Sequence, residues 1–230
     1  MKEGVAQFAE ARDVYHSAVL SRLVRKVVTI EIRQRLFERA AALLAYFNIP
    51  NANGDRLEAL CRDKQRMIAH LIDEGKFTAY DDALGFAVKA KCAGALLGAA
   101  SSSKNANKLI SKVELHEFCR RSGLECCFVR PQTTLLDIFD ANVCGRELAR
   151  GKPHPEIFLS AAEMLGREPG ACVVIEDAPS GVQAAKSGGM LCIGVARLDD
   201  QDLLRSAGAD WVVSSLNGID PVALLRSPPR

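Results

Sequence analysis

Two adjacent carboxylates, Glu176 and Asp177, directly follow a short apolar run and precede a turn and a helical pattern. The run 172–175 predicts a buried strand, and 180–187 predicts a helix that ends at glycine. Side chains at the carboxyl end of a strand in an open parallel sheet face the ligand crevice. Buried carboxylates need a cation or a partner, and hard oxygen ligands beside phosphate suit Mg²⁺. The pair therefore predicts a divalent-metal site; the alternative is a helix cap beside a solvated neighbour.

The second candidate is the lysine in the sequence Gly151-Lys152-Pro153-His154-Pro155, which precedes another helical pattern. The prolines stiffen the loop and open the helix, so they hold Lys152 in one direction. A fixed ammonium suits a phosphoryl group. The alternative is an exposed lysine in a turn, where most lysines lie. We expect His154 to cap the helix or face solvent rather than to act as a base.

The third candidate is the polar loop Ser101-Ser102-Ser103-Lys104-Asn105, which follows an apolar run rich in small residues. A hydroxyl at a strand end, next to a helix N-terminus, can donate to a phosphate oxygen alongside main-chain N–H groups. Serine also caps helices, and for this loop alone the cap is the favoured interpretation. The order of the three candidates along the chain favours a phosphate site over coincidence.

Strand and helix patterns alternate from Tyr80 onward, and this alternation positions the three loops. We predict strands over 94–100, 172–175, 191–195 and 211–214, and a strand or turn within 135–143. We predict helices over 81–91, 106–122, 156–166, 180–187 and 200–207, and a last helix opened by Asp220 and Pro221. The alternation predicts an α/β fold, with a parallel sheet covered by helices on both faces.

Residues 1–79 are expected to form a helical region ahead of an α/β core of residues 80–230. Thr29 can cap a helix over 30–47, and a breaker-rich loop over 48–54 follows it. A second helix, with apolar residues at helical spacing, is predicted to end before Gly75. The β-branched run 27–32 is the one segment here that could instead be a strand.

Length and composition limit the function classes. The chain has 230 residues, a formal net charge of +2 and 48% hydrophobic residues, which is ordinary for a soluble globular protein. The charge gives no argument for nucleic acid or a membrane surface, and no stretch is long and apolar enough to cross a bilayer. The first residues lack a signal-peptide core, so a cytoplasmic location is expected. We expect a monomer or a weak dimer.

Eight cysteines and four histidines complete the inventory of candidate ligands. The cysteines form no C-x-x-C pair and several lie in apolar runs, so we expect reduced, mostly inert thiols. The vicinal pair Cys126-Cys127 is the one place where redox sensitivity is conceivable. The histidines are scattered and form no metal-ligand pattern.

From residue 77 to 213 the chain resembles the haloacid dehalogenase superfamily, and within it the β-phosphoglucomutase-like phosphatases and mutases. The resemblance rests on three motifs. They are A-S-S-S-K-N from Ala100, G-K-P-H-P-E-I-F from Gly151, and V-I-E-D from Val174 together with the segment that follows it as far as Gly189. It implies a Rossmann-like core with a helical cap, here residues 1–79, that closes over the substrate.

The resemblance also implies roles for individual residues. Ser101 binds the transferring phosphoryl group, with Ser102 and Asn105 as further phosphate contacts. Lys152 steadies the phosphoryl group and the nucleophile, while Glu176 and Asp177 hold Mg²⁺. In the cap, Arg62 and Lys64 lie in a stretch that is similar to one meeting the substrate, although a solvated helix face remains the alternative for either residue.

One motif of the family is absent, the D-x-D-G sequence that supplies the aspartate nucleophile and the general acid/base. Asp81 and Asp82 open a helix, so capping explains them better. A distorted candidate is Glu31-Ile32-Arg33, but arginine cannot serve as the acid. Three explanations of this absence are open. The protein starts upstream of Met1, or residues 27–32 fill the place of the missing central strand, or the chain is a degenerate relative. We expect the first, because the downstream motifs are intact.

The resulting hypothesis is a Mg²⁺-dependent phosphoryl-transfer enzyme for a small phosphorylated metabolite, such as a sugar phosphate, acting as a phosphatase or a mutase. The alternative is a relative that binds phosphate and Mg²⁺ without turnover, because covalent catalysis needs a carboxylate in line with the phosphorus. An unrelated nucleotide-binding module is disfavoured, since neither G-x-G-x-x-G nor G-x-x-x-x-G-K-[ST] occurs.

Overall fold

The computed structural model describes residues 54–126 and 128–226, which fall into two compact units, 54–78 and 79–226. The first unit contains helix α3 (Gly54–Asp73), which is the second helix predicted for this region. Gly75 follows it at φ +68°, the left-handed conformation that glycine adopts most easily. The helix predicted over 30–47 and the rival strand over 27–32 lie outside the described residues.

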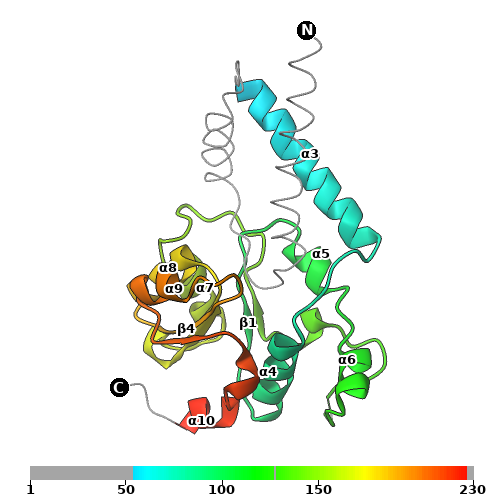
Figure 1. Cartoon of the computed structure of the whole chain (residues 1–230), viewed down its shortest axis with the longest axis vertical. Helices are drawn as coiled ribbons and strands as arrows, with labels where there is room; N and C mark the ends of the chain where they lie inside the picture. The colour runs from blue at the N-terminus through cyan, green and yellow to red at the C-terminus, as the bar shows by residue number, and fades with distance from the viewer. Residues whose placement is uncertain (1–53, 127, 227–230) are drawn as a thin grey trace. The chain divides into compact units, whose positions relative to one another are not determined.

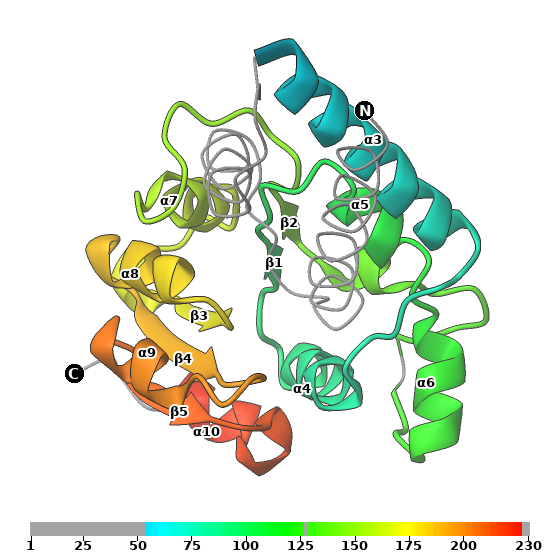
Figure 2. The same cartoon turned by 45° about the horizontal axis from the view of Figure 1, so that its top comes forward.

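The second unit is built on parallel strands. In its described part, β1 (Gly98–Ala99) pairs with β2 (Ala141–Asn142), and a second sheet has the order β3-β4-β5. The bounds of this second sheet are Val173–Glu176, Leu191–Val195 and Trp211–Val213. Every pairing is parallel (Figure 2). Helices connect successive strands, as parallel neighbours require, so the predicted α/β fold is confirmed.

Helices cover both faces of the three-stranded sheet (Figure 1). Their bounds are α4 Asp81–Cys92, α7 Glu156–Met164, α8 Pro179–Ser187, α9 Gln201–Ser206 and α10 Pro221–Arg226. Val174 and Cys192 are buried in one cluster with residues of α7, α8 and α9. Ile193 and Val195 belong to a second cluster with residues of α4 and α10. Because successive strand residues point to opposite faces, the apolar run of β4 serves both layers.

The segment between β1 and β2 departs from the sequence prediction. The single helix predicted over 106–122 is two helices, α5 (Ala106–Ile110) and α6 (Leu115–Ser122). The Leu135 N–H donates to the Val113 carbonyl at 2.8 Å, and the Leu115 N–H donates to the Thr133 carbonyl at 2.9 Å. Main-chain groups engaged across this long range cannot extend a helix. A tertiary contact therefore overrides the helical pattern.

Most other boundaries lie close to their predictions. β4 has the predicted bounds, whereas β3 begins and ends one residue later than predicted. The strand predicted over 94–100 was too long, since only Gly98–Ala99 pairs. Asp220 caps the last helix as predicted, with its Oδ1 accepting from the Val222 N–H at 2.9 Å. Short 3₁₀ helices complete the unit: η1 Leu135–Ile138, η2 Pro169–Ala171 and η3 Leu216–Gly218.

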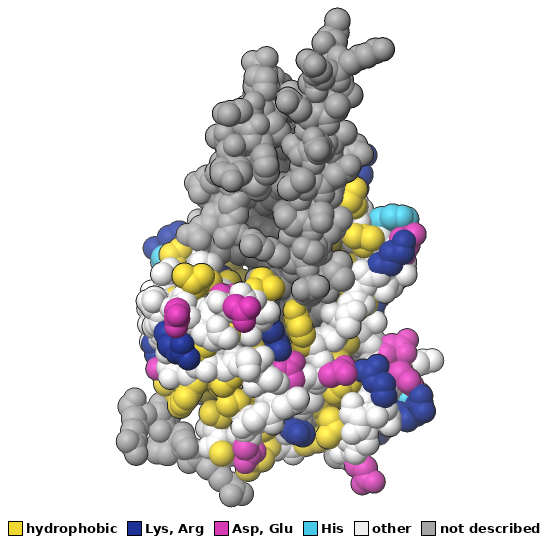
Figure 3. Space-filling view, viewed as in Figure 1, with side chains coloured by type: hydrophobic (Ala, Val, Ile, Leu, Met, Phe, Trp, Pro, Cys, Tyr) yellow, Lys and Arg dark blue, Asp and Glu magenta, His cyan; other side chains and the backbone are white. Residues whose placement is uncertain are grey.

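The visible face of the described region intersperses basic and acidic side chains, without one large patch of a single sign (Figure 3). Several pair with each other at the surface, for example Arg121 with Asp81 at 2.8 Å. No helix in the described part of the chain is long and apolar enough to span a bilayer. The cysteines with described side chains are free thiols, namely Cys92, Cys119, Cys126, Cys144, Cys172 and Cys192.

Candidate active site

Two of the three predicted loops meet at the carboxyl end of β3. The Lys152 ammonium forms an ion pair with Glu176 Oε1, and the two side chains are 4% and 0% exposed. Lys152 comes from the loop between β2 and α7, and Glu176 is the last residue of β3. The alternative interpretation of Lys152 as an exposed lysine in a turn is therefore wrong. A buried charge without a partner is strongly disfavoured, so each side chain depends on the other.

Glu176 is held by the turn that follows it. Its Oε2 accepts from the main-chain N–H groups of Asp177 at 3.1 Å and Ala178 at 3.3 Å. A Cβ at Gly181, in the first turn of α8, would overlap the Glu176 carboxylate. Gly181, five residues after Glu176, thus has a physical reason, since only glycine lets the carboxylate lie against the start of this helix.

The Lys152 loop is fixed by its own polar contacts. Glu156 accepts from the Ala149 N–H at 2.9 Å and the Arg150 N–H at 3.0 Å. These main-chain hydrogen bonds, beginning with that from Ala149, hold the pKa of the Glu156 carboxyl below its usual range. His154 Nδ1 accepts from the Glu156 N–H at 3.2 Å, which agrees with the predicted capping role. The Lys152 ammonium also lies 4.8 Å from the centre of the Phe158 ring.

Asp177 is buried beside this pair, with 8% of its surface exposed. Glu176 Oε1 accepts from Lys152 and its Oε2 from the main chain, and Asp177 adds a second buried carboxylate at the same strand end. The described residues contain no group of three or more His, Cys, Asp or Glu side chains that could hold a metal. Mg²⁺ commonly uses only one or two carboxylates together with waters and substrate phosphate. The donor chemistry at this strand end therefore fits Mg²⁺.

The serine loop after β1 is folded on its own hydroxyl groups. Ser101 Oγ accepts from the Ser103 N–H at 3.2 Å, and Ser103 Oγ accepts from the Asn105 N–H at 3.3 Å. Ser101 and Ser103 are buried, while Ser102 and Asn105 are half-buried. Asn105 precedes α5, and no side-chain cap forms there. The serine hydroxyl groups therefore order the loop ahead of α5 rather than capping the helix itself.

Cys144 connects the serine loop to Lys152. Burial raises the pKa of its thiol to about 11, against the opposing effects of the Ser101 main chain and the Lys152 ammonium. The same thiol thus lies near members of two predicted motifs. The next residue, Gly145 at φ +70°, donates its N–H to the Ser101 carbonyl at 2.7 Å. The loops after β1 and β2 are in this way tied together.

Sequence reasoning missed two asparagines that brace these loops. Asn142, at the end of β2, donates to Asn107 Oδ1 at 2.8 Å and accepts from the Cys144 N–H at 2.9 Å. Asn107, on α5, donates to the Cys144 carbonyl at 3.3 Å. The available signal was a polar residue directly after the apolar end of a strand, which is the same signal that identified Glu176 and Asp177.

The predicted cap residues lie in the first unit. Arg62 is exposed on α3, and the side chain of Lys64 lies outside the described residues. Arg66, in the same stretch, pairs with Asp63 at 2.8 Å in an exposed position. A role of Arg62 and Lys64 in substrate binding therefore stays a prediction.

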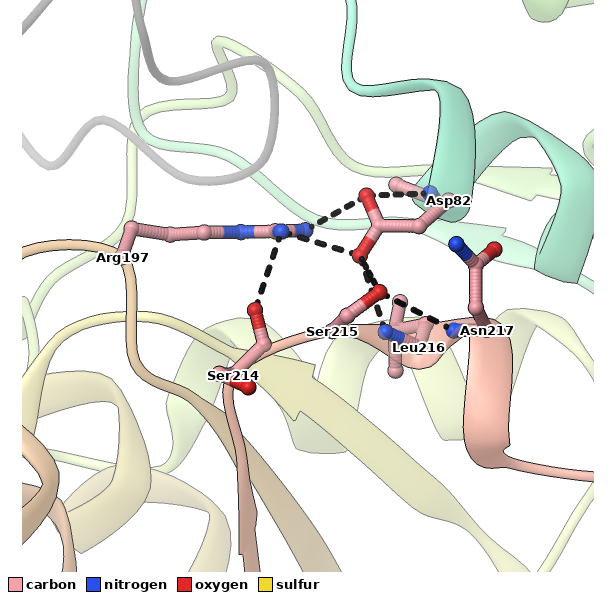
Figure 4. A network of polar contacts seen from close by, with 7 residues as sticks. Asp82, Arg197, Ser214, Ser215, Leu216 and Asn217 are labelled. Carbon is pink, nitrogen blue, oxygen red and sulfur yellow. Dashed lines mark hydrogen bonds and ion pairs between the residues drawn. The ribbon is translucent and has the colours of Figure 1, made fainter.

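A second buried ion pair was not predicted, and it lies after β4 (Figure 4). Asp82 accepts from both terminal nitrogens of Arg197, at 2.9 and 3.0 Å. It also accepts from Ser215 Oγ at 3.0 Å and from the Leu216 N–H at 2.8 Å. The Arg197 guanidinium lies 4.1 Å from the centre of the Tyr80 ring. Asp82 lies in the first turn of α4 as predicted, and its Oδ1 also accepts from the Ala83 N–H at 3.0 Å. The prediction missed that the same carboxylate joins α4 to the loops after β4 and β5.

The charge state of Asp82 follows from these contacts. Burial opposes ionisation of the carboxyl, but the hydrogen bonds from Arg197 and Leu216 and the positive charge of Arg197 outweigh it, so the pKa is lowered. An Asp–Arg pair with two parallel hydrogen bonds is among the stronger pairings in proteins. The carboxylate is therefore ionised at neutral pH.

Comparison with known proteins agrees with the motifs. The sequence profile of the haloacid dehalogenase-like hydrolases matches residues 18–189. β-Phosphoglucomutase of Bacillus subtilis is 39% identical over 117 residues, which cover 51% of this chain and 41% of that protein. Hexitol phosphatase B of Escherichia coli is 37% identical over 91 residues, 40% of this chain and 41% of the relative. The matched part is thus less than half of either relative.

Solved structures extend the comparison over more of the chain. The archaeal β-phosphoglucomutase from Pyrococcus sp. strain ST 04 superposes with a TM-score of 0.63 at 25% identity, covering 96% of this chain and 90% of that one. The β-phosphoglucomutase of Clostridium difficile gives 0.59 at 24% identity, covering 90% and 86%. These structures show the same fold, and the profile match over residues 18–189 establishes that the chain belongs to the haloacid dehalogenase-like hydrolase family.

Proposed function

We propose that the protein is a Mg²⁺-dependent phosphoryl-transfer enzyme that acts on a small phosphorylated metabolite, a sugar phosphate, as a phosphatase or a mutase. The observation that carries the proposal is the buried Lys152–Glu176 pair at the end of β3, with Asp177 buried beside it. A buried ion pair is costly to desolvate and is a poor device for stability alone. Its position at the ligand edge of the sheet supports a binding role.

Each side chain then has a task that its contacts support. An ammonium carries three N–H donors, so Lys152 can hold Glu176 and still donate to a phosphoryl oxygen. Ser101, fixed by its hydrogen bond with Ser103, can donate a hydroxyl hydrogen to the same group. Asn105 and Ser102 are the further phosphate contacts. Asp177 and Glu176 would hold Mg²⁺, which when bound supplies positive charge to a phosphoryl group in transfer.

The substrate class rests on the relatives. The relatives include a β-phosphoglucomutase and a hexitol phosphatase, which supports a phosphorylated sugar or polyol. By the family resemblance, residues 1–79 are proposed as the cap region, with Arg62 and Lys64 as substrate contacts. Closure of such a cap excludes or admits water, which decides between a mutase and a phosphatase.

The nucleophile is the open part of this mechanism. No D-x-D-G sequence occurs in the 230 residues, and covalent phosphoryl transfer needs a carboxylate in line with phosphorus. This observation favours a second candidate, a protein that binds phosphate and Mg²⁺ without turnover. The two candidates share the same site and differ only in whether a phosphoryl group is transferred.

Titration calorimetry of the full chain with inorganic phosphate, with and without MgCl₂, tests the site. We expect binding that requires Mg²⁺ and an affinity loss of about 100-fold in Lys152→Met, as for removal of one donor to a charged phosphoryl group. Lys186→Met is the matched control, because Lys186 also pairs with an aspartate, Asp210 at 2.7 Å, but away from the three loops. Equal binding by both variants would contradict the proposed site.

Turnover is measured separately on a panel of sugar phosphates, both as phosphate released and as isomerisation of the sugar phosphate. Either reaction, if it depends on Mg²⁺ and on Lys152, supports the enzyme. Phosphate binding with neither release nor isomerisation for any member of the panel selects the second candidate for this polypeptide.

A further inference from the structure

Two cysteine thiols lie in contact far from the proposed active site. Cys92 Sγ and Cys126 Sγ are 3.0 Å apart, although the residues are 34 positions apart in the sequence. Cys92 is the last residue of α4, at the amino end of β1, whereas the three loops of the proposed site follow strand carboxyl ends. Cys92 is exposed and Cys126 is half-buried. A disulfide has a sulfur–sulfur bond of about 2 Å, so a shift of about 1 Å would close it.

Packing that does not involve sulfur positions this pair. Asp81, at the start of α4, pairs with Arg121 near the end of α6 at 2.8 Å. In the middle of α4, Gly85 faces Phe118 and Leu124, which a Cβ on the glycine would meet at 3.8 and 4.0 Å. The thiols therefore approach each other because the helices bring them together.

An oxidant can reach the pair. A surface cavity of about 340 Å³ is lined by Cys92 and by Leu124 and Glu125, the two residues that precede Cys126. Two of the other described thiols are protected: Cys144 and Cys192 are buried, and burial raises their thiol pKa values to about 11 and about 12. Because the thiolate is the reactive form, these two thiols are poor competitors.

We propose that Cys92 and Cys126 form a reversible disulfide that responds to peroxides and staples α4 to the segment after α6. The sulfur of exposed Cys92 attacks a peroxide oxygen, the O–O bond breaks, and a sulfenic acid and water form. The Cys126 sulfur then attacks the sulfenic sulfur, the S–O bond breaks, and the oxygen leaves as a second water. Two thiols are oxidised and one hydrogen peroxide is reduced. A small dithiol restores the reduced form by exchange.

The staple restrains the unfolded chain rather than the site. Closing a loop of this length lowers the entropy of the unfolded state, so we expect the melting temperature to rise by about 5–10 °C on oxidation. Phosphate affinity is expected to stay the same, because the loops that would bind phosphate lie at the opposite ends of the strands.

The test treats the reduced full chain with hydrogen peroxide and maps disulfides by peptide mass spectrometry without reduction. We expect a Cys92–Cys126 linked peptide, reversal by dithiothreitol, and loss of both the link and the thermal shift in Cys92→Ser and in Cys126→Ser. Cys172→Ser is the matched control, because Cys172 is also half-buried but lies before β3. It should form the link like the wild type.

Three outcomes would overturn the inference. One is a link between Cys126 and either Cys127 or Cys119, the latter a buried neighbour whose thiol pKa is raised by burial and by Cys126. Another is a sulfenic or sulfinic acid at Cys92 with no linked peptide. The third is a linked peptide that forms without any change in melting temperature, which would refute the staple.

Discussion

The Asp82–Arg197 and Lys152–Glu176 pairs both bury opposite charges, yet they are built for different purposes. Asp82 receives two hydrogen bonds from one guanidinium and further ones from Ser215 and Leu216. Lys152 meets Glu176 through one ammonium hydrogen bond, and buried Asp177 lies next in sequence. A planar guanidinium fixes geometry, whereas an ammonium is a point charge with donors to spare. The Asp82–Arg197 pair joins three segments of the chain, whereas the Lys152 ammonium has further donors for a ligand.

Removing the Asp82 carboxylate is the strongest test of the difference between the two pairs. Asp82→Ala leaves the guanidinium of Arg197 buried without its counter-ion and the Leu216 N–H without its acceptor, so we expect a loss of about 3 kcal/mol in the free energy of unfolding. Urea unfolding followed by circular dichroism measures it. Phosphate affinity of the folded fraction should not change. A loss of phosphate affinity without a loss of stability would reverse the roles assigned to the two pairs.

The turn that holds Glu176 gives the next effect. In Gly181→Ala the added methyl group would overlap the Glu176 carboxylate, and relief requires movement of a buried charged group. We expect a loss of about 2 kcal/mol in unfolding free energy, within the range for overpacked cores. Gly170→Ala is the control, since a Cβ there would meet nothing within 4 Å and the residue has no positive φ. Equal stability of the two variants would refute the close contact.

Replacing both partners of each pair sharpens the comparison further. Lys152→Met with Glu176→Gln removes both charges, and the glutamine can still accept from Asp177 and Ala178, so unfolding free energy should stay within about 1 kcal/mol of the wild type. Asp82→Leu with Arg197→Met should still lose about 2 kcal/mol, because Leu216 and Ser215 lose their acceptor. Similar losses in the two double variants would show that the pairs are equivalent.

The different predictability of these two pairs follows from the kind of signal each one gives. Glu176 follows an apolar strand, and Lys152 lies between prolines, so both were found from local patterns. Their contact needed only the rule that parallel strands end at the same edge. Asp82 and Arg197 are 115 positions apart. No sequence feature near either residue predicts contact with the other. A carboxylate at a helix start is already explained by its favourable interaction with the helix N-terminus.

The same distinction explains the errors in the fold. β4 and α8 were predicted well because strand and helix patterns act within a few residues. The helix predicted over 106–122 was wrong because the chain near Val113 pairs with residues 133–135, a distant segment. Asn107 and Asn142 were missed for a related reason, since their amides contact each other only after α5 and β2 are placed. Long-range pairing is what the local sequence does not encode.

The smallest expected effect is the pH dependence of the Asp82 pair. The folded-state pKa of Asp82 is lowered below its ordinary value of 3.8, so its contribution to stability is complete well above pH 3.8 and is lost as the pH falls through the lowered value. The difference in unfolding free energy between the wild type and Asp82→Asn should therefore be constant from about pH 5 to 8 and should shrink below about pH 4. Asp202→Asn is the control, because its side chain is 96% exposed and its pairing with Arg205 should contribute little at any pH. A difference that stays constant into acid would mean that the Asp82 charge does not stabilise the fold. The joining of α4 to the loops after β4 and β5 would then rest on packing and neutral hydrogen bonds alone.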